Sequence, residues 1–295
     1  MKRLAILLGA GLVAASGPLG APPAGRGPGP LCRIIVPVNI VGTRADGTPD
    51  DRRGLLRDLA AGLGLSVADV TRIRGATGVI ICRLDKERVL GSAVLVGRGV
   101  VLTVAHMLRD SSEGFAEFPR GTPCRFRTQA VPPQEVPLLL DGSEVLGAGG
   151  QDDLNDTRDY AVLRLAAPLT DVEPFEVGTP VAVKTGLILI SGFQWDMPTV
   201  APSEPIAQLA EVETEVTPPN APRAYFLRGA METGGSGGVA LVRQDGVLKA
   251  VGIVSSTGNT MRNGWPFSVE NSSFVRVIAL EGAVVDAIGR LTRMP

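Results

Sequence analysis

The stretch Gly99-Val100-Val101-Leu102-Thr103-Val104-Ala105-His106 decides how the rest of the chain is interpreted. Its apolar and β-branched residues predict a buried strand, which ends in a short turn at the histidine. His106 is the only histidine among the 295 residues. Histidine is the side chain whose ordinary pKa suits it to exchange protons near neutral pH. A single histidine is more often structural than catalytic, so its role depends on what the other stretches supply.

A serine-containing stretch, Thr233–Gly238 (TGGSGG), places Ser236 among four glycines. Glycines let the backbone turn tightly enough for the N–H groups of Gly234 and Ser236 to point at one spot. Such a spot stabilises the negative charge that develops in acyl transfer, as an oxyanion hole does. A flexible Gly/Ser loop has the same composition, so this stretch alone is a weak signal.

An aspartate, Asp159, stands directly before the apolar run Tyr160–Leu165. A carboxylate at the mouth of a buried strand can accept the Nδ1–H of a histidine and fix its tautomer. An ordinary aspartate at a strand start is the alternative. Three further acids compete in the preceding loop: Asp152, Asp153 and Asp156.

Taken together, these stretches resemble the trypsin/chymotrypsin-like serine peptidases, in their bacterial branch. Thr103–His106, Asp159–Leu165 and Gly234–Gly238 resemble the histidine, aspartate and serine motifs of that family, in the family's chain order. The resemblance covers about residues 76 to 295. It implies an all-β fold of two packed antiparallel β-barrels with a C-terminal helix. It also implies a serine endopeptidase that hydrolyses polypeptides through an acyl-enzyme and needs no cofactor, with His106, Asp159 and Ser236 as its triad.

The resemblance also suggests where substrate binds. Val251–Ser255 resembles the strand that pairs with substrate backbone, and the base of the specificity pocket falls near Ala230. Thr257 and Ser272 are expected on the pocket walls. Because no carboxylate stands at the base, we expect a preference for small or medium uncharged side chains rather than Arg or Lys.

One departure from the family concerns activation. Many members have an aspartate just before the nucleophile, with which a freed N-terminus pairs after cleavage. Here that position is Gly235, so this ion pair cannot form. Two other hypotheses remain open: a catalytically silent relative that binds a partner through the same cleft, and an esterase that uses the same triad.

The N-terminal part reads as an export signal. Residues 1–15 combine a basic start with an apolar run that ends at small residues, as in a signal peptide. Residues 16–32 are a Gly/Pro-rich tether, 33–75 a helical extension, and 76–295 the peptidase domain. The apolar run is short for a membrane span, although an uncleaved anchor is the alternative. We expect a periplasmic or extracellular protein with no further membrane contact.

The extension predicts two helices, Asp50–Leu63 and Ser66–Arg72, the second with a capping pattern at Ser66 and Asp69. Two helices around Gly64 also resemble a DNA-binding helix-turn-helix. Lys plus Arg number 29 against 30 Asp plus Glu, so the charge balance does not favour a nucleic-acid partner. A pro-segment, a lid and a simple packing unit all fit this extension.

Three cysteines and the remaining strands complete the expectations. Cys82 lies in a strand-like run and Cys124 in a predicted loop, so they can pair if the fold brings them together. Cys32 is then the odd one out. A metal site is not expected, and the sequence leaves the oligomeric state open. The remaining predicted elements are strands at Val79–Leu84, Val89–Val96, Leu187–Ser191, Val239–Arg243 and Leu248–Ser255, and a final helix at Leu280–Leu291.

Overall fold

The computed structural model describes residues 51–83, 86–110, 116–118, 121–141, 144–147, 157–194, 197, 204–259 and 272–294. The predicted signal peptide (1–15), the tether (16–32) and Cys32 lie outside these residues. The division of the chain into domains therefore stays a prediction. Within the described part, no helix is both long and apolar enough to cross a membrane.

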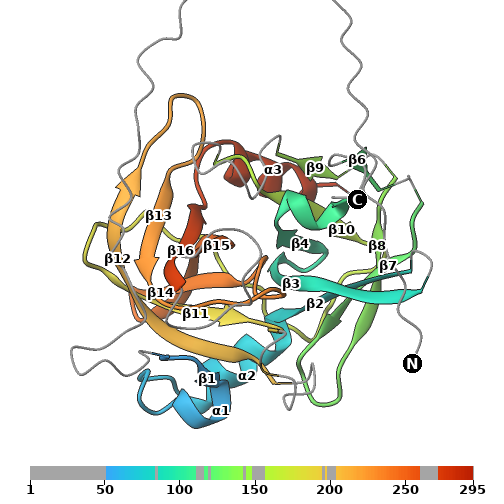
Figure 1. The fold of residues 1–295 in the computed structure, drawn as a ribbon. Helices are drawn as coiled ribbons and strands as arrows, with labels where there is room; N and C mark the ends of the chain where they lie inside the picture. Colours follow the sequence, from blue (N-terminus) through green and yellow to red (C-terminus); the bar gives the residue numbers. More distant parts are fainter. Residues whose placement is uncertain are drawn as a thin grey trace, which may run out of the picture. The chain divides into compact units, whose positions relative to one another are not determined.

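Six antiparallel strands form the first barrel (Figure 1). Their order is β4-β3-β2-β7-β8-β10, and β10 pairs with β4 to close the ring. Side chains fill the interior of so small a barrel, which explains why all four residues of β4 are buried. The strands are β2 (Thr77–Arg83), β3 (Glu87–Gly97), β4 (Val100–Thr103), β7 (Cys124–Thr128), β8 (Glu135–Leu139) and β10 (Ala161–Leu165), with β9 (Val145–Leu146) added beside β10.

Six further strands form the second barrel, in the order β12-β11-β14-β15-β16-β13. The long strand β12 closes this barrel, because its second half pairs with β13. The first residues of β12 also pair with β1, which lies outside the ring. The predicted fold of two packed antiparallel barrels is confirmed, and each barrel has six strands. The strands are β11 (Gly186–Ser191), β12 (Ile206–Val216), β13 (Ala224–Arg228), β14 (Val239–Gln244), β15 (Val247–Asn259) and β16 (Ser272–Ala279), and β1 is Gly54–Leu55.

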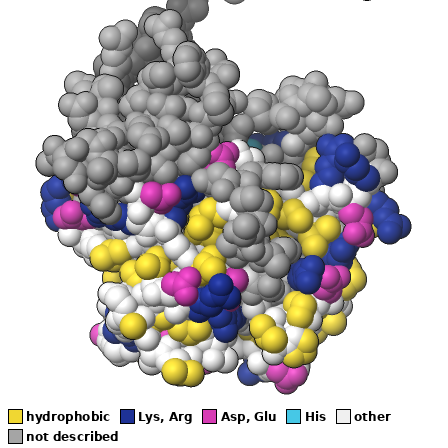
Figure 2. Space-filling model, turned by 60° about the horizontal axis from the view of Figure 1, so that its bottom comes forward, with side chains coloured by type: hydrophobic (Ala, Val, Ile, Leu, Met, Phe, Trp, Pro, Cys, Tyr) yellow, Lys and Arg dark blue, Asp and Glu magenta, His cyan; other side chains and the backbone are white. Residues whose placement is uncertain are grey.

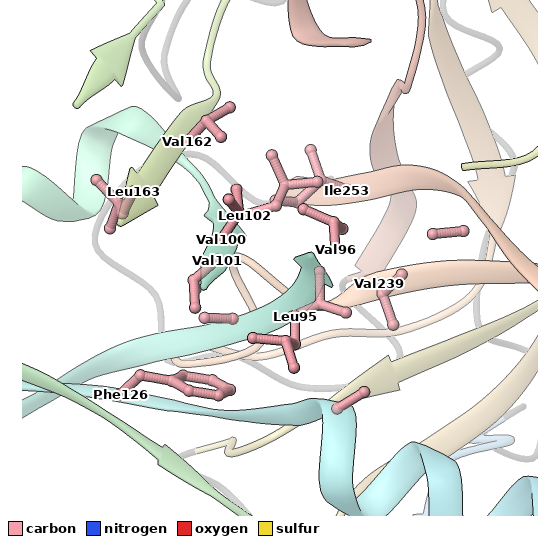
Figure 3. Close-up of a cluster of buried hydrophobic side chains, with 14 of the residues drawn as sticks. Leu95, Val96, Val100, Val101, Leu102, Phe126, Val162, Leu163, Val239 and Ile253 are labelled. Atoms are coloured by element: carbon pink, nitrogen blue, oxygen red, sulfur yellow. The ribbon is translucent and has the colours of Figure 1, made fainter. Parts of the chain in front are cut away.

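One hydrophobic cluster extends from the first barrel into the second (Figure 3). Leu95 and Leu102 of the first barrel belong to the same cluster as Val239 and Ile253 of the second. The C-terminal helix α3 (Ala283–Thr292) contributes Val284 to it and packs against β4 and β10. The predicted terminal helix is confirmed, and this shared core holds the two barrels together. The remaining short elements are η1 (Ala105–Leu108), β5 (Arg109–Asp110) and β6 (Ala116–Glu117).

A disulfide bond joins Cys82 to Cys124 within the first barrel. The two cysteines stand opposite each other on the paired strands β2 and β7. The prediction that Cys124 lies in a loop was wrong, because Cys124 begins strand β7. That strand alternates buried residues with half-buried arginines, a period of two that the sequence reading did not use.

The first predicted helix is much shorter than expected. Only Leu56–Leu59 (α1) is helical, and Gly54–Leu55 before it is a strand, because its backbone pairs with the open edge of β12. The second helix, α2, runs from Val67 to Ala76 and begins at the predicted capping box of Ser66 and Asp69. Around α1, α2 and β1, the face shown in Figure 2 carries basic and acidic side chains next to one another.

Candidate active site

His106 lies in the short turn η1 that follows strand β4. The pairing of β10 with β4 sets Ala161 opposite Thr103. Continuing this register by two residues places Asp159 beside the turn that carries His106. The contact between these two side chains is therefore a consequence of barrel closure.

Asp159 is completely buried and accepts three hydrogen bonds. Its Oδ1 accepts the backbone N–H of His106 at 2.9 Å, and its Oδ2 lies 2.7 Å from Nδ1 of the same histidine. The hydroxyl of Ser255 donates to Oδ2 at 2.7 Å. The three competing acids of the preceding loop all lie outside the described residues: Asp152, Asp153 and Asp156.

These contacts decide the ionisation of Asp159. Burial alone raises the pKa of this carboxyl group, but the hydrogen bonds and charge of His106, together with the bond from Ser255, lower the pKa below its ordinary value of 3.8. The carboxylate is thus ionised at neutral pH and can only accept hydrogen bonds. Nδ1 of the histidine therefore carries the proton, and Nε2 is left as the basic nitrogen.

Ser236 lies in a glycine-rich loop of the second barrel, directly before β14. Gly234 and Gly237 have φ angles of 95° and 81°, in the left-handed region that favours glycine. A Cβ atom on Gly237 would collide with the carbonyl oxygen of Ser92. The glycines are therefore required both by the turn and by close contact with the first barrel.

The amides of this loop divide into two groups. Those of Gly235, Gly237 and Gly238 donate to backbone carbonyls of the protein. Within the described part of the chain, the amides of Gly234 and Ser236 donate no backbone hydrogen bond. These two N–H groups are the ones that the sequence predicted for an oxyanion hole.

The hydroxyl of Ser236 donates to the backbone carbonyl of Ser255 at 3.2 Å. Within the described residues, no hydrogen bond joins it to the ring of His106. Sequence reasoning placed Ser255 on a substrate-pairing strand, and β15 does contain it. The structure adds two contacts of its side chain: Ser255 Oγ donates to Asp159 and accepts from the fully buried Arg276 at 2.9 Å. The sequence analysis did not single out Arg276, and its contact with Ser255 was missed.

Ser92 of strand β3 was also missed, although it joins the two barrels at the nucleophile loop. Its N–H donates to the carbonyl of Ser236 at 2.8 Å, and its hydroxyl donates to the carbonyl of Gly234 at 2.8 Å. The same hydroxyl accepts the N–H of Gly192 at 2.9 Å. A serine inside an apolar strand was the available signal, because a buried hydroxyl needs hydrogen-bond partners.

The predicted pocket residues lie on, or directly after, neighbouring strands of the second barrel. Ala230 follows β13 and is buried, with its carbonyl bound at 2.6 Å by the side-chain amide of Gln208. Thr257 on β15 donates to the carbonyl of Phe274 at 2.9 Å. Ser272 begins β16, the strand between β13 and β15. Gln208 was not predicted, and it fixes the backbone at the expected pocket base.

The described residues contain no group of three or more His, Cys, Asp or Glu side chains arranged to hold a metal ion. The sequence model of the trypsin-like peptidase domain family matches residues 91–253, more than half of the chain. No curated protein sequence matches.

Among solved structures, the chain is similar to a Glu endopeptidase in complex with MPD, with a TM-score of 0.58 and 14% sequence identity. The superposition covers 83% of this chain and 98% of that one. At this identity the likeness concerns the fold.

Proposed function

The chain belongs to the family of trypsin-like peptidase domains, and on this premise we propose that it is a serine endopeptidase with the triad His106, Asp159 and Ser236. The observation that carries the proposal is the buried, ionised Asp159 that binds Nδ1–H of His106 beside the loop of Ser236. A buried carboxylate bound in this way orients the imidazole and leaves Nε2 basic. Such a base is what a serine hydroxyl needs to become a nucleophile.

In the proposed reaction, the hydroxyl of Ser236 turns from the carbonyl of Ser255 to Nε2 of His106. Nε2 takes its proton as Oγ attacks the peptide carbonyl, and Asp159 stabilises the resulting imidazolium. His106 then gives the proton to the leaving amine, which breaks the peptide bond and leaves an acyl-enzyme. Water, activated by the same histidine, hydrolyses this ester and restores Ser236.

The oxyanion of each tetrahedral intermediate binds the N–H groups of Gly234 and Ser236. The division of the loop amides supports this assignment, because the neighbouring amides of Gly235, Gly237 and Gly238 already donate to protein carbonyls. Preorganised donors of this kind contribute about 3–4 kcal/mol each to transition-state stabilisation.

For substrate side chains we propose a preference for small or medium uncharged residues. The support is the uncharged, buried Ala230 at the expected base of the pocket, with Thr257 and Ser272 on neighbouring strands. A peptide library digested by the protein shows the preference directly. Cuts clustered after Arg or Lys would contradict it.

We also propose that the protein is exported and acts outside the cytoplasm. The support is the sequence of residues 1–15, with its basic start and apolar run. The N-terminal sequence of the protein recovered from the periplasm or the medium tests this. The expected mature chain begins close after Ala15, whereas protein that retains residues 1–15 would contradict cleavage.

Labelling with a fluorophosphonate probe tests the catalytic proposal. The folded wild type is expected to react, and Ser236→Ala and His106→Ala are expected to remain unlabelled while giving the same near-UV circular dichroism. A folded wild type that stays unlabelled would favour the silent relative. Labelled protein that hydrolyses small esters but no peptide in the library would favour the esterase.

A further inference from the structure

Residues 51–57, the N-terminal strap, lie outside the part of the chain that matches the peptidase family. Their strand β1 pairs with the first residues of β12, and the N–H of Leu56 donates to the carbonyl of Pro205 at 2.8 Å. The side chain of Leu56 is fully buried in the hydrophobic cluster that both barrels share. The N-terminal strap is therefore attached to the second barrel by backbone pairing as well as by burial.

Arg53, like Leu56, points into the protein. Its side chain is only 2% exposed, and its Nη1 donates to Oε1 of Gln194 at 2.6 Å. The Nε and Nη2 atoms of the same guanidinium bind the carboxylate of Asp51 at 2.9 and 2.8 Å. The planar guanidinium is thus held from two sides, and its direction toward Gln194 is fixed.

Gln194 in turn contacts the loop that carries the nucleophile. Its Oε1 also accepts the backbone N–H of Glu232 at 3.1 Å, and its Nε2 donates to Ser191 Oγ at 2.9 Å. The carbonyl of Glu232 in turn accepts the N–H of Gly235 at 3.0 Å, which closes the turn that contains Gly234. Gln194 is 2% exposed, so water does not replace these bonds readily.

We infer that Arg53 is a positioning residue that holds the turn Glu232–Gly235 through Gln194. In that conformation the amides of Gly234 and Ser236 are available for the oxyanion. The inference rests on the proposed function, because it assigns Arg53 to the same site. Family members with an aspartate before the nucleophile bind it with a freed N-terminus, and here Gly235 removes that possibility. The internal residue Arg53 stabilises the loop in its place.

The role of Arg53 argues against one of the functions that the sequence left open for the extension, that of a pro-segment. A pro-segment leaves upon activation, whereas removal of the N-terminal strap would take Arg53 away from Gln194. A second set of contacts supports a permanent role for the N-terminal strap. The N–H of Arg57 donates to the carboxylate of Glu204 at 3.0 Å, and the guanidinium of Arg74 binds that carboxylate at 2.7 and 2.9 Å. The N-terminal strap is thus part of the active enzyme.

The test uses full-length protein with the substitutions Arg53→Ala, Arg53→Lys and Gln194→Leu. Arg57→Ala is the matched control, since it removes an arginine of the same segment whose side chain is 61% exposed. We measure kcat and KM on a peptide that the wild type cleaves. Arg53→Ala and Gln194→Leu are expected to lower kcat about 10- to 100-fold with KM changed less than about twofold, because the loss concerns oxyanion stabilisation.

Two further readouts separate positioning from general stability. Guanidinium chloride at low millimolar concentration is expected to restore activity to Arg53→Ala but not to Gln194→Leu. Arg53→Lys is expected to lie between wild type and Arg53→Ala, because an ammonium keeps the charge without the planar fork. Amide hydrogen exchange of residues 232–236 is expected to rise at least about tenfold in Arg53→Ala and to stay unchanged in Arg57→Ala.

The possible failures are distinguishable. If Arg53→Ala matches Arg57→Ala in kcat and in exchange at residues 232–236 while the wild type is active, the inference is wrong and the proposed function stands. If the wild type neither cleaves nor labels, the proposed function fails, and the exchange data alone decide whether Arg53 holds the turn. If Arg53→Ala does not fold, Arg53→Lys and Gln194→Leu decide in its place, and wild-type kcat and exchange in both would overturn the inference.

Discussion

Ser92→Ala removes a single oxygen atom at the point where the nucleophile loop contacts the first barrel. The lost hydroxyl donates to the carbonyl of Gly234 at 2.8 Å and accepts the N–H of Gly192 at 2.9 Å. The backbone N–H of residue 92 remains and still binds the carbonyl of Ser236. The substitution therefore tests the two side-chain bonds while the backbone bond stays in place.

The expected loss of stability in Ser92→Ala follows from the burial of the two groups that lose their partner, the carbonyl of Gly234 and the N–H of Gly192. Ser92 is 1% exposed, and Gly192 and Gly234 are both buried. A buried donor or acceptor that loses its partner costs about 1–3 kcal/mol, so two of them cost about 2–6 kcal/mol of unfolding free energy. The released Gly234 carbonyl also frees the peptide next to a proposed oxyanion donor. We expect kcat to fall about tenfold or more in the protein that remains folded.

Urea unfolding and steady-state kinetics measure the two effects. Ser256→Ala is the control for stability, because the hydroxyl of Ser256 is buried and has no hydrogen-bond partner in the described part of the chain. Its unfolding free energy is expected to change by less than about 0.5 kcal/mol or to rise slightly. A Ser92→Ala protein with wild-type stability and wild-type kcat would refute the reasoning that this hydroxyl joins the barrels at the site.

Three further outcomes are expected. Ser255→Ala removes one of the hydrogen bonds that lower the pKa of Asp159, so that pKa rises toward its ordinary value. Because the folded-state pKa of Asp159 is lowered, its ionised form contributes stability above pH 3.8, and this contribution is lost as the pH falls through the folded-state value. The stability difference between wild type and Ser255→Ala should accordingly be present at about pH 6 and shrink toward about pH 2. Equal differences at both pH values in urea unfolding would contradict the assignment. Replacing Cys82 and Cys124 together by alanine opens a loop of 42 residues and is expected to lower the free energy of unfolding by about 4 kcal/mol. A wild-type urea midpoint that does not change when reductant is added would argue against this contribution. Phe126→Ala empties a fully buried position and should cost about 3–5 kcal/mol in the same assay, and a cost below about 1 kcal/mol would mean that the barrel collapses around the gap.

Local patterns predicted several elements correctly, and they failed where a distant partner decides the conformation. The run Gly99–Thr103 and the helical spacing near the C-terminus are readable because burial imposes a period on neighbouring residues. The predicted helix over Asp50–Leu63 failed because Gly54–Leu55 finds an open edge of β12, which lies about 150 residues further along the chain. The loop assignment of Cys124 failed for a different reason, because the alternation of residues 124–128 with a period of two was present in the sequence but was not used.

The sequence by itself determined which chemistry is available: one histidine at a strand end, one aspartate before a strand and one serine among glycines. Only the tertiary structure decided how these groups are held. Ser92 and Gly234 lie 142 residues apart, and Arg53 and Gln194 lie 141 apart, yet each pair is hydrogen-bonded. No local pattern records such a contact, because its two partners share no strand, helix or turn. Ser92 meets Gly234 because the two barrels pack on one core, and Arg53 meets Gln194 because β1 pairs with β12.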